Sequence, residues 1–301
     1  MPLPRLVSVW IARRPRLFEV GIGKNCLCWQ IITKMDAKNS DKQQVQVNFE
    51  LHPPIEDDLD GATTLLRQNF LHFADCSGLA RYLIKQKEVT QVVAVEAPDE
   101  ENTSEDEEPD NDIYGLSSII ELPTPKSKDA DELETEARRQ LLNFLKNKCP
   151  RFKDFLESED TATKIGLIVN ERYINLPPQL ALPQMKSLTE HIDQTKYSHL
   201  AFFSKILLRA KQDETRLPNK KTKSGGSSSF EPIIYVNPEE EIIFEGCEYH
   251  EDIDVSQHCD ENASWSTSSD AKYIPHRRIM IVDYKKWQDI LMNLSKELKA
   301  A

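Results

Sequence analysis

The sequence predicts one α/β domain in which helices lie on the faces of a mixed, twisted β-sheet. Runs with helical periodicity and apolar runs typical of strands alternate irregularly along the 301 residues. No internal repeat is visible, and the long polar inserts fall between expected strands. We therefore expect one continuous domain at residues 45–299, preceded by an N-terminal extension at residues 1–44.

Helices are predicted where apolar residues recur on one face. After Asp60, which can cap a helix, five apolar residues between 62 and 73 share a face. The remaining helices are expected at residues 77–87, 131–148, 152–156, 184–194 and 287–298.

Strands are predicted from alternating or continuous apolar runs. The run at residues 164–170 is almost entirely apolar, as expected for a buried central strand. Residues 233–236 and 241–244 are predicted to form a hairpin. The other strands are expected at residues 45–51, 89–95, 114–122, 200–208 and 278–282.

The net charge of −12 is unevenly distributed along the chain. Residues 1–34 carry six basic residues and one acid, a net of +5, so the remainder carries −12 − 5 = −17. Residues 99–112 hold nine acids in fourteen positions, and such dense like charge predicts a disordered loop between two strands. An acidic body repels nucleic acid and attracts basic proteins. The alternative is that the charge serves solubility alone.

The basic, acid-poor segment at residues 1–34 is interpreted as a disordered extension or an annotation artefact, with an organelle transit peptide as the alternative. The six cysteines lack the spacing of a disulfide scaffold and are interpreted as reduced thiols of a cytosolic or nuclear protein. No apolar run is long enough for a transmembrane helix.

Motifs of several enzyme classes are missing from the sequence. It contains no P-loop, no Gly-x-Ser-x-Gly elbow, no His-Glu-x-x-His and no glycine-rich dinucleotide turn. One group of residues has a spacing near that of zinc ligands: Cys247, His250, His258 and Cys259. However, adjacent His and Cys are unusual in a closed tetrahedral zinc site. The many acids around this group are typical of a solvated loop. We expect no catalytic residue, metal or cofactor there, nor a metal at Cys26 and Cys28.

Residues 166–183 are the most distinctive segment: Gly-Leu-Ile-Val-Asn-Glu-Arg-Tyr-Ile-Asn-Leu-Pro-Pro-Gln-Leu-Ala-Leu-Pro. A double proline between an apolar strand and a helix rarely recurs by chance. The segment resembles the signature of the BCCIP family, eukaryotic nuclear interaction proteins. The resemblance extends over about residues 45–299 through three further segments, at residues 47–61, 239–244 and 279–298.

The resemblance implies a fold similar to that of small N-acetyltransferases, used for binding rather than catalysis. It also implies an adaptor or chaperone role in cell-cycle control, DNA repair, nuclear export or ribosome assembly. The alternative function is an acetyltransferase that uses acetyl-CoA. Those enzymes hold the pyrophosphate in an Arg/Gln-x-x-Gly-x-Gly/Ala turn at a helix start, but here no glycine has Arg or Gln three positions before it.

The expected partners are basic proteins, such as a large-subunit ribosomal protein, or cell-cycle and repair proteins, without direct contact to nucleic acid or membrane. The residues predicted to bind them are the acids of the loop: Asp99, Glu100, Glu101, Glu105, Asp106, Glu107, Glu108, Asp110 and Asp112. The alternative is that this loop is a solubilising spacer.

Two modification or targeting signals are predicted. Ser104 precedes three acids and is a candidate for an acid-directed kinase. Lys220, Lys221 and Lys223, in a polar Ser/Gly-rich loop at residues 211–229, form a short import signal or simply a solvated cluster. Two basic features depart from the BCCIP pattern: the acidic tail is replaced by a basic segment, and the lysine-rich stretch is short. Nuclear and cytoplasmic pools are both expected.

Overall fold

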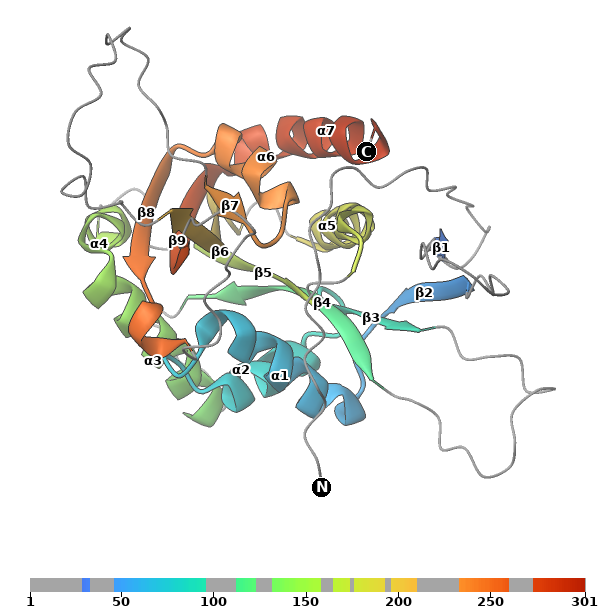
Figure 1. The fold of residues 1–301 in the computed structure, drawn as a ribbon. Helices are drawn as coiled ribbons and strands as arrows, with labels where there is room; N and C mark the ends of the chain where they lie inside the picture. Colours follow the sequence, from blue (N-terminus) through green and yellow to red (C-terminus); the bar gives the residue numbers. More distant parts are fainter. Residues whose placement is uncertain are drawn as a thin grey trace, which may run out of the picture.

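The computed structural model describes residues 29–32, 46–95, 112–122, 132–157, 165–173, 176–192, 196–209, 233–259 and 273–300. Within them, one nine-stranded sheet lies between two layers of helices (Figure 1). Its strands are β1 (Trp29–Ile32), β2 (Gln46–His52), β3 (Gln91–Val95), β4 (Ile113–Glu121), β5 (Ile165–Arg172), β6 (His199–Arg209), β7 (Ile234–Tyr235), β8 (Tyr249–Asp254) and β9 (Tyr273–Asp283).

The strand order is β1-β2-β3-β4-β5-β6-β9-β8, with β7 paired to β6. Among the described strands, β5 and β6 are the parallel pair, and all other pairs are antiparallel. A parallel pair needs a crossover connection, and this one contains a helix, α5 (Ala181–His191).

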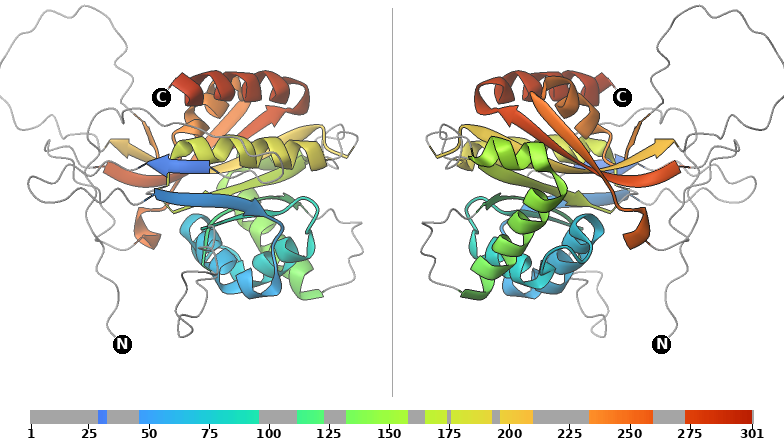
Figure 2. Two further views of the ribbon diagram at one scale, coloured as in Figure 1. Left: turned by 90° about the vertical axis from the view of Figure 1, so that its right-hand side faces the viewer. Right: turned by 90° about the vertical axis from the view of Figure 1, so that its left-hand side faces the viewer.

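Helices cover both faces of the sheet (Figure 2). One face carries α1 (Leu59–Phe70), α2 (Cys76–Lys85), α3 (Glu132–Lys148) and α4 (Pro150–Glu157). The other face carries α5, α6 (Glu239–Gly246) and α7 (Tyr284–Ala300). None of these helices, in the part of the chain that is described, is long and apolar enough to cross a membrane.

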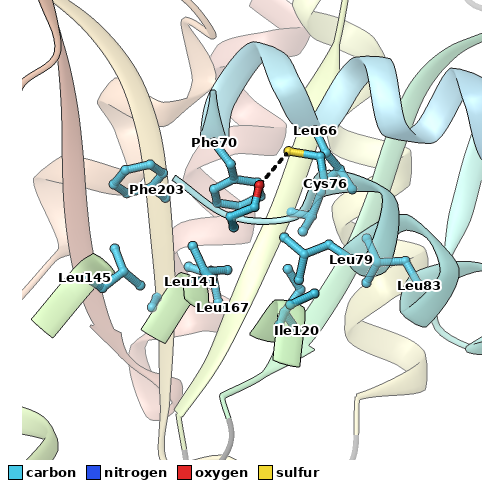
Figure 3. Close-up of a cluster of buried hydrophobic side chains, with 14 of the residues drawn as sticks. Leu66, Phe70, Cys76, Leu79, Leu83, Ile120, Leu141, Leu145, Leu167 and Phe203 are labelled. Atoms are coloured by element: carbon cyan, nitrogen blue, oxygen red, sulfur yellow. Dashed lines mark hydrogen bonds between the residues drawn. The ribbon is translucent and has the colours of Figure 1, made fainter. Parts of the chain in front are cut away.

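Each face has its own apolar core. On the α1 side, leucines and phenylalanines from α1, α2 and α3 pack onto β5 and β6 (Figure 3). Ile120 of β4, Leu167 of β5 and Phe203 of β6 are the strand residues labelled in this view, and all three are almost fully buried. Fully burying one such side chain contributes about 1.5–3 kcal/mol. On the other side, Trp287 of α7 anchors the core and donates a hydrogen bond to Thr189 of α5 at 2.8 Å.

The predicted fold class, a mixed sheet with helices on its faces, is confirmed. One predicted strand is wrong, because residues 241–244 lie in α6 rather than in a hairpin. Pro238 immediately precedes this helix, and three glutamates in its first turn suit the positive end of the helix dipole.

Three further differences concern the cap of α1, the strand β8 and the beginning of the sheet. Asp60 does not cap α1, which begins one residue earlier; instead the Asp58 carboxylate accepts a hydrogen bond from the N–H of Ile55 at 2.8 Å. β8 was not predicted, because its alternation of polar residues resembles a solvated loop. β1 pairs with β2 and therefore extends the sheet before residue 45, where the domain was expected to begin.

Candidate functional site at the split between β5 and β6

The sheet opens at the carboxyl end of β5. β5 and β6 pair from Ile165 opposite His199 to Ile168 opposite Phe202, and no further. Beyond that point β7 pairs with β6, and the N–H of Val236 donates to the carbonyl of Lys205 at 3.0 Å. Ligands of open α/β sheets commonly bind where neighbouring strands part at their carboxyl ends. This split is therefore the candidate ligand-binding site of the sheet.

On the α6 side, the split is closed by a buried ion pair. The Arg172 guanidinium donates through two nitrogens to the two carboxylate oxygens of Glu239, one of these bonds being 2.7 Å long. The Asn170 amide donates to the same carboxylate at 2.9 Å. The Arg172 and Glu239 side chains are 3% and 0% exposed. The end of β5 is thus joined directly to the first turn of α6.

On the α1 side, Glu171 makes the corresponding link. Its carboxylate accepts from the Asn69 amide of α1 at 2.6 Å and from the Lys205 ammonium of β6 at 2.5 Å. All three residues are buried. Because side chains alternate along a strand, Asn170 and Arg172 serve one face of the sheet and Glu171 serves the other.

Side-chain amides also satisfy backbone carbonyls at the split. The Asn69 amide donates to the carbonyl of Phe203 at 2.5 Å. The Asn237 amide donates to the carbonyl of Asn170 at 3.1 Å. Buried carbonyls need such partners. Asn69 and Asn237 therefore supply hydrogen-bond donors to two backbone carbonyls of the parted strands.

The charges of this network balance once Glu240 is protonated. Burial, and next the adjacent Glu239, raise the pKa of Glu240 to about 8, although a hydrogen bond from Asn237 lowers it. One Glu240 oxygen is buried without a hydrogen-bond partner in the described part of the chain, a costly place for a full charge. With Glu240 neutral, the cations of Arg172 and Lys205 face two carboxylates, those of Glu171 and Glu239.

Arg172 keeps its charge despite burial. Burial by itself would lower the pKa of Arg172, but the charge of Glu239 and its hydrogen bonds raise it above the ordinary value. Asn170, Glu171 and Arg172 are consecutive residues at the carboxyl end of β5. In the structure each of them has a buried partner on another element. The split is thus filled by the protein's own side chains.

Most of the predicted site residues lie outside the described residues: Asp99, Glu100, Glu101, Ser104, Glu105, Asp106, Glu107, Glu108, Asp110, Lys220, Lys221 and Lys223. Asp112 is described and is exposed directly before β4. The acidic loop connects β3 with β4, which are antiparallel neighbours, so its two ends meet at one end of the sheet. Its role in binding stays a prediction.

The residues with zinc-like spacing are separated by β8. Cys247 lies between α6 and this strand and His250 is the second residue of the strand, whereas His258 and Cys259 follow its end. The His250 ring contacts the Phe244 ring with centroids 4.9 Å apart. Within the described ranges, no group of three or more His, Cys, Asp or Glu side chains is placed to hold a metal ion. Cys26 and Cys28 lie outside those ranges.

Sequence patterns did not identify the partners of the network: Asn69, Lys205, Asn237, Glu239 and Glu240. One signal was available, because Lys205 interrupts the apolar run of β6. Lysine is almost never buried without a partner, so a lysine inside a central strand indicates a buried carboxylate nearby.

The comparison with known proteins gives relatives along most of the chain. It is 26% identical over 272 residues to the Protein BCCIP homolog of Drosophila melanogaster, covering 84% of this chain and 85% of the relative. It is also 26% identical over 268 residues to the BRCA2 and CDKN1A-interacting protein of Bos taurus, covering 85% of this chain and 84% of that relative.

Among solved structures, the crystal structure of BCP1 from Saccharomyces cerevisiae has the same fold. Its TM-score is 0.54 at 16% identity, over 87% of this chain and 93% of that one. A mutant agmatine N-acetyltransferase in its apo form matches with a TM-score of 0.37 and 8% identity over 78% of this chain and 99% of that one, a likeness too distant to carry a conclusion.

A match to a protein-family model covers most of the described sheet. The BCCIP family matches residues 44–243, which is more than half of the 301 residues and includes β2 to β7 and most of α6. This stretch contains both sides of the split and the residues that fill it. The chain therefore belongs to the BCCIP family.

Proposed function

We propose that this protein is a non-catalytic adaptor or chaperone that binds basic protein clients through its surface. The observation that carries the proposal is the closed split between β5 and β6. Segment 234–240, together with Asn69, fills the position where an α/β sheet commonly admits a small ligand. The filled split supports binding of clients at the exterior of the protein rather than in a crevice of the sheet.

The charge of the chain favours basic clients. The net charge is −12, and nine acids lie within residues 99–112. A surface of one sign speeds the encounter with partners of the opposite sign and repels nucleic acid. A chaperone with this charge would shield a basic client from unwanted contacts with nucleic acid.

The names of relatives suggest the kind of client. The bovine relative is named for interaction with BRCA2 and CDKN1A, which supports clients of this chain in cell-cycle control or DNA repair. A large-subunit ribosomal protein is the second kind, with roles in ribosome assembly and nuclear export. We expect nuclear and cytoplasmic pools of the protein, which fluorescence microscopy of the tagged protein would reveal. Exclusive mitochondrial staining would contradict this location.

Affinity capture tests the proposal. The tagged full-length chain is incubated with cell extract at low and at high salt, and bound proteins are identified by mass spectrometry. The matched control is a variant in which the nine acids of residues 99–112 are changed to Asn and Gln. Basic proteins should be enriched at low salt and depleted both at high salt and with the control. Captured proteins without any excess of basic residues would refute a basic client.

The competing function, an acetyltransferase, is tested by calorimetry. We expect no saturable binding of acetyl-CoA at millimolar concentration, because the chain lacks the phosphate-binding turn and the split is filled. A stoichiometric binding isotherm would overturn the non-catalytic proposal.

A further inference from the structure

Three aromatic rings form a row at one end of the sheet. Phe49 of β2 meets Tyr114 of β4 edge-on, with ring centroids 6.0 Å apart. Tyr114 meets Tyr173, the residue after β5, in the same manner at 6.1 Å. We call these three residues the aromatic row. Phe49 is buried, whereas 37% of Tyr173 is exposed, so the row leads from the core to the solvent.

The row has a firm base. Phe49 and Leu51 lie opposite Val95 and Val93, so these four side chains share one face of β2 and β3. The N–H of Tyr173 donates to the carbonyl of Tyr114 at 3.0 Å, which fixes the outer end.

The preceding residue secures Tyr173 from the other direction. Arg172 is held by the buried pair with Glu239. The Tyr173 ring is therefore presented to solvent by a rigid strand end. Such a large exposed aromatic side chain is a frequent anchor in protein interfaces. In Figure 1, β1 and β2 lie at the right-hand end of the sheet, beyond α5 and α1.

One described carboxylate, that of Asp112, stands close to this row in the chain. Asp112 is exposed and stands two residues before Tyr114. Val95 pairs with Phe49, and the chain enters the acidic stretch at Asp99, four residues later. The described residues on the two sides of the acidic stretch, Val95 and Asp112, thus belong to the strands that carry Phe49 and Tyr114 or to their direct neighbours. A client segment drawn to these acids arrives next to an exposed tyrosine ring.

We propose that the aromatic row is the docking surface for an extended, arginine-containing segment of a client, with a guanidinium stacked on the Tyr173 ring. This proposal rests on the proposed function and names its surface. Arginine suits the site better than lysine, because the planar guanidinium stacks on an aromatic face and is less strongly hydrated than an ammonium group.

The test uses two fluorescein-labelled peptides of equal charge, six Arg-Gly repeats and six Lys-Gly repeats, with binding followed by fluorescence anisotropy at about 0.1 M salt. Tyr173→Ala should weaken binding of the arginine peptide about two- to five-fold, the range of an exposed cation–π contact. Tyr173→Phe should bind as wild type, because it keeps the ring. Met292→Ala, which removes an exposed apolar side chain of α7, is the matched control and should change nothing. Circular dichroism melts show that each variant is folded.

The outcomes separate this proposal from the basic-client proposal. If wild type binds neither peptide, the basic-client proposal fails and the docking surface fails with it. If neutralising the acids of residues 99–112 weakens binding but folded Tyr173→Ala binds as wild type, the basic client stands and the aromatic row is not its docking surface. An equal loss for both peptides with Tyr173→Ala would refute the preference for arginine.

Discussion

Arg172 and Glu239 form a buried two-point ion pair that bridges the split in the sheet, although 67 positions separate them in the sequence. Arg172 ends β5 and Glu239 begins α6. The pair fixes the place of α6 and, through the strand end, the orientation of the neighbouring Tyr173. The effect of this ion pair on the stability of the fold and its effect on client binding at Tyr173 can be measured separately.

Removal of one partner should destabilise the fold strongly. Arg172→Ala leaves the Glu239 carboxylate buried without its cation and should lower the free energy of unfolding by about 3–5 kcal/mol, measured by urea denaturation. Arg172→Lys should cost less, because an ammonium group keeps the charge but not the two-point geometry.

A matched exposed pair is the control for that experiment. Arg139 binds Glu136 with side chains 52% and 47% exposed. Arg139→Ala should change the free energy of unfolding by no more than about 1 kcal/mol. Equal losses for Arg139→Ala and Arg172→Ala would contradict the assigned importance of the buried pair.

The stability of the protein should fall as pH rises from about 4.5 to about 8. In the folded state the pKa of Glu240 is raised from 4.5 to about 8, by burial first and by Glu239 second. Between these values the folded protein holds a proton that the unfolded chain has lost. The contribution of this proton to the free energy of unfolding is therefore full below pH 4.5 and is lost as the pH rises to 8. The free energy of unfolding falls over this range by up to about 1.4 kcal/mol per pH unit.

The test is urea denaturation of wild type and Glu240→Gln across this pH range. Glu240→Gln mimics the neutral carboxyl and should remove the slope, so its advantage over wild type should grow toward pH 8. Glu241→Gln changes the exposed neighbouring carboxylate and should keep the wild-type slope. Parallel pH profiles for wild type and Glu240→Gln would show that Glu240 carries no buried proton.

Neutralising the acidic loop should slow association more than it speeds dissociation. Nine carboxylates attract a basic client over a distance but fix little geometry. The effect should shrink as salt shortens the Debye length from about 10 Å at 0.1 M to about 3 Å at 1 M. Phosphorylation of Ser104 adds negative charge and should raise the association rate. Stopped-flow kinetics with the captured client measure these association rates. Equal association rates of wild type and the neutralised variant at low salt would show that the loop is only a spacer.

Purified protein should carry no stoichiometric zinc. Replacing Cys247 and His250 with Ala should leave the melting temperature nearly unchanged, since Cys247 is only half-buried, His250 is exposed, and substitutions outside the buried core cost little. Elemental analysis and thermal melts check this expectation. One zinc ion per chain, together with a lower melting temperature of the variant, would contradict it.

Local sequence patterns predicted the elements that are periodic by themselves. Residues 131–148 were expected as a helix and form α3, and the apolar run at 164–170 forms most of β5. The predicted hairpin failed at residues 241–244, where isoleucines and a phenylalanine suit a strand as well as a buried helix. Only tertiary contacts distinguish a helix from a strand here: Ile243 packs into the core under α7, and Glu239 is buried.

The sequence by itself determined the fold class, the acidic stretch and the distinctive segment at residues 166–183, because composition and short-range periodicity are properties of neighbouring residues. The tertiary structure decided what that segment does. Asn170, Glu171 and Arg172 could equally have faced solvent, until α1, β6 and α6 brought Asn69, Lys205 and Glu239 to them. A charge is buried only where its partners converge, and that convergence depends on contacts between residues far apart in the chain.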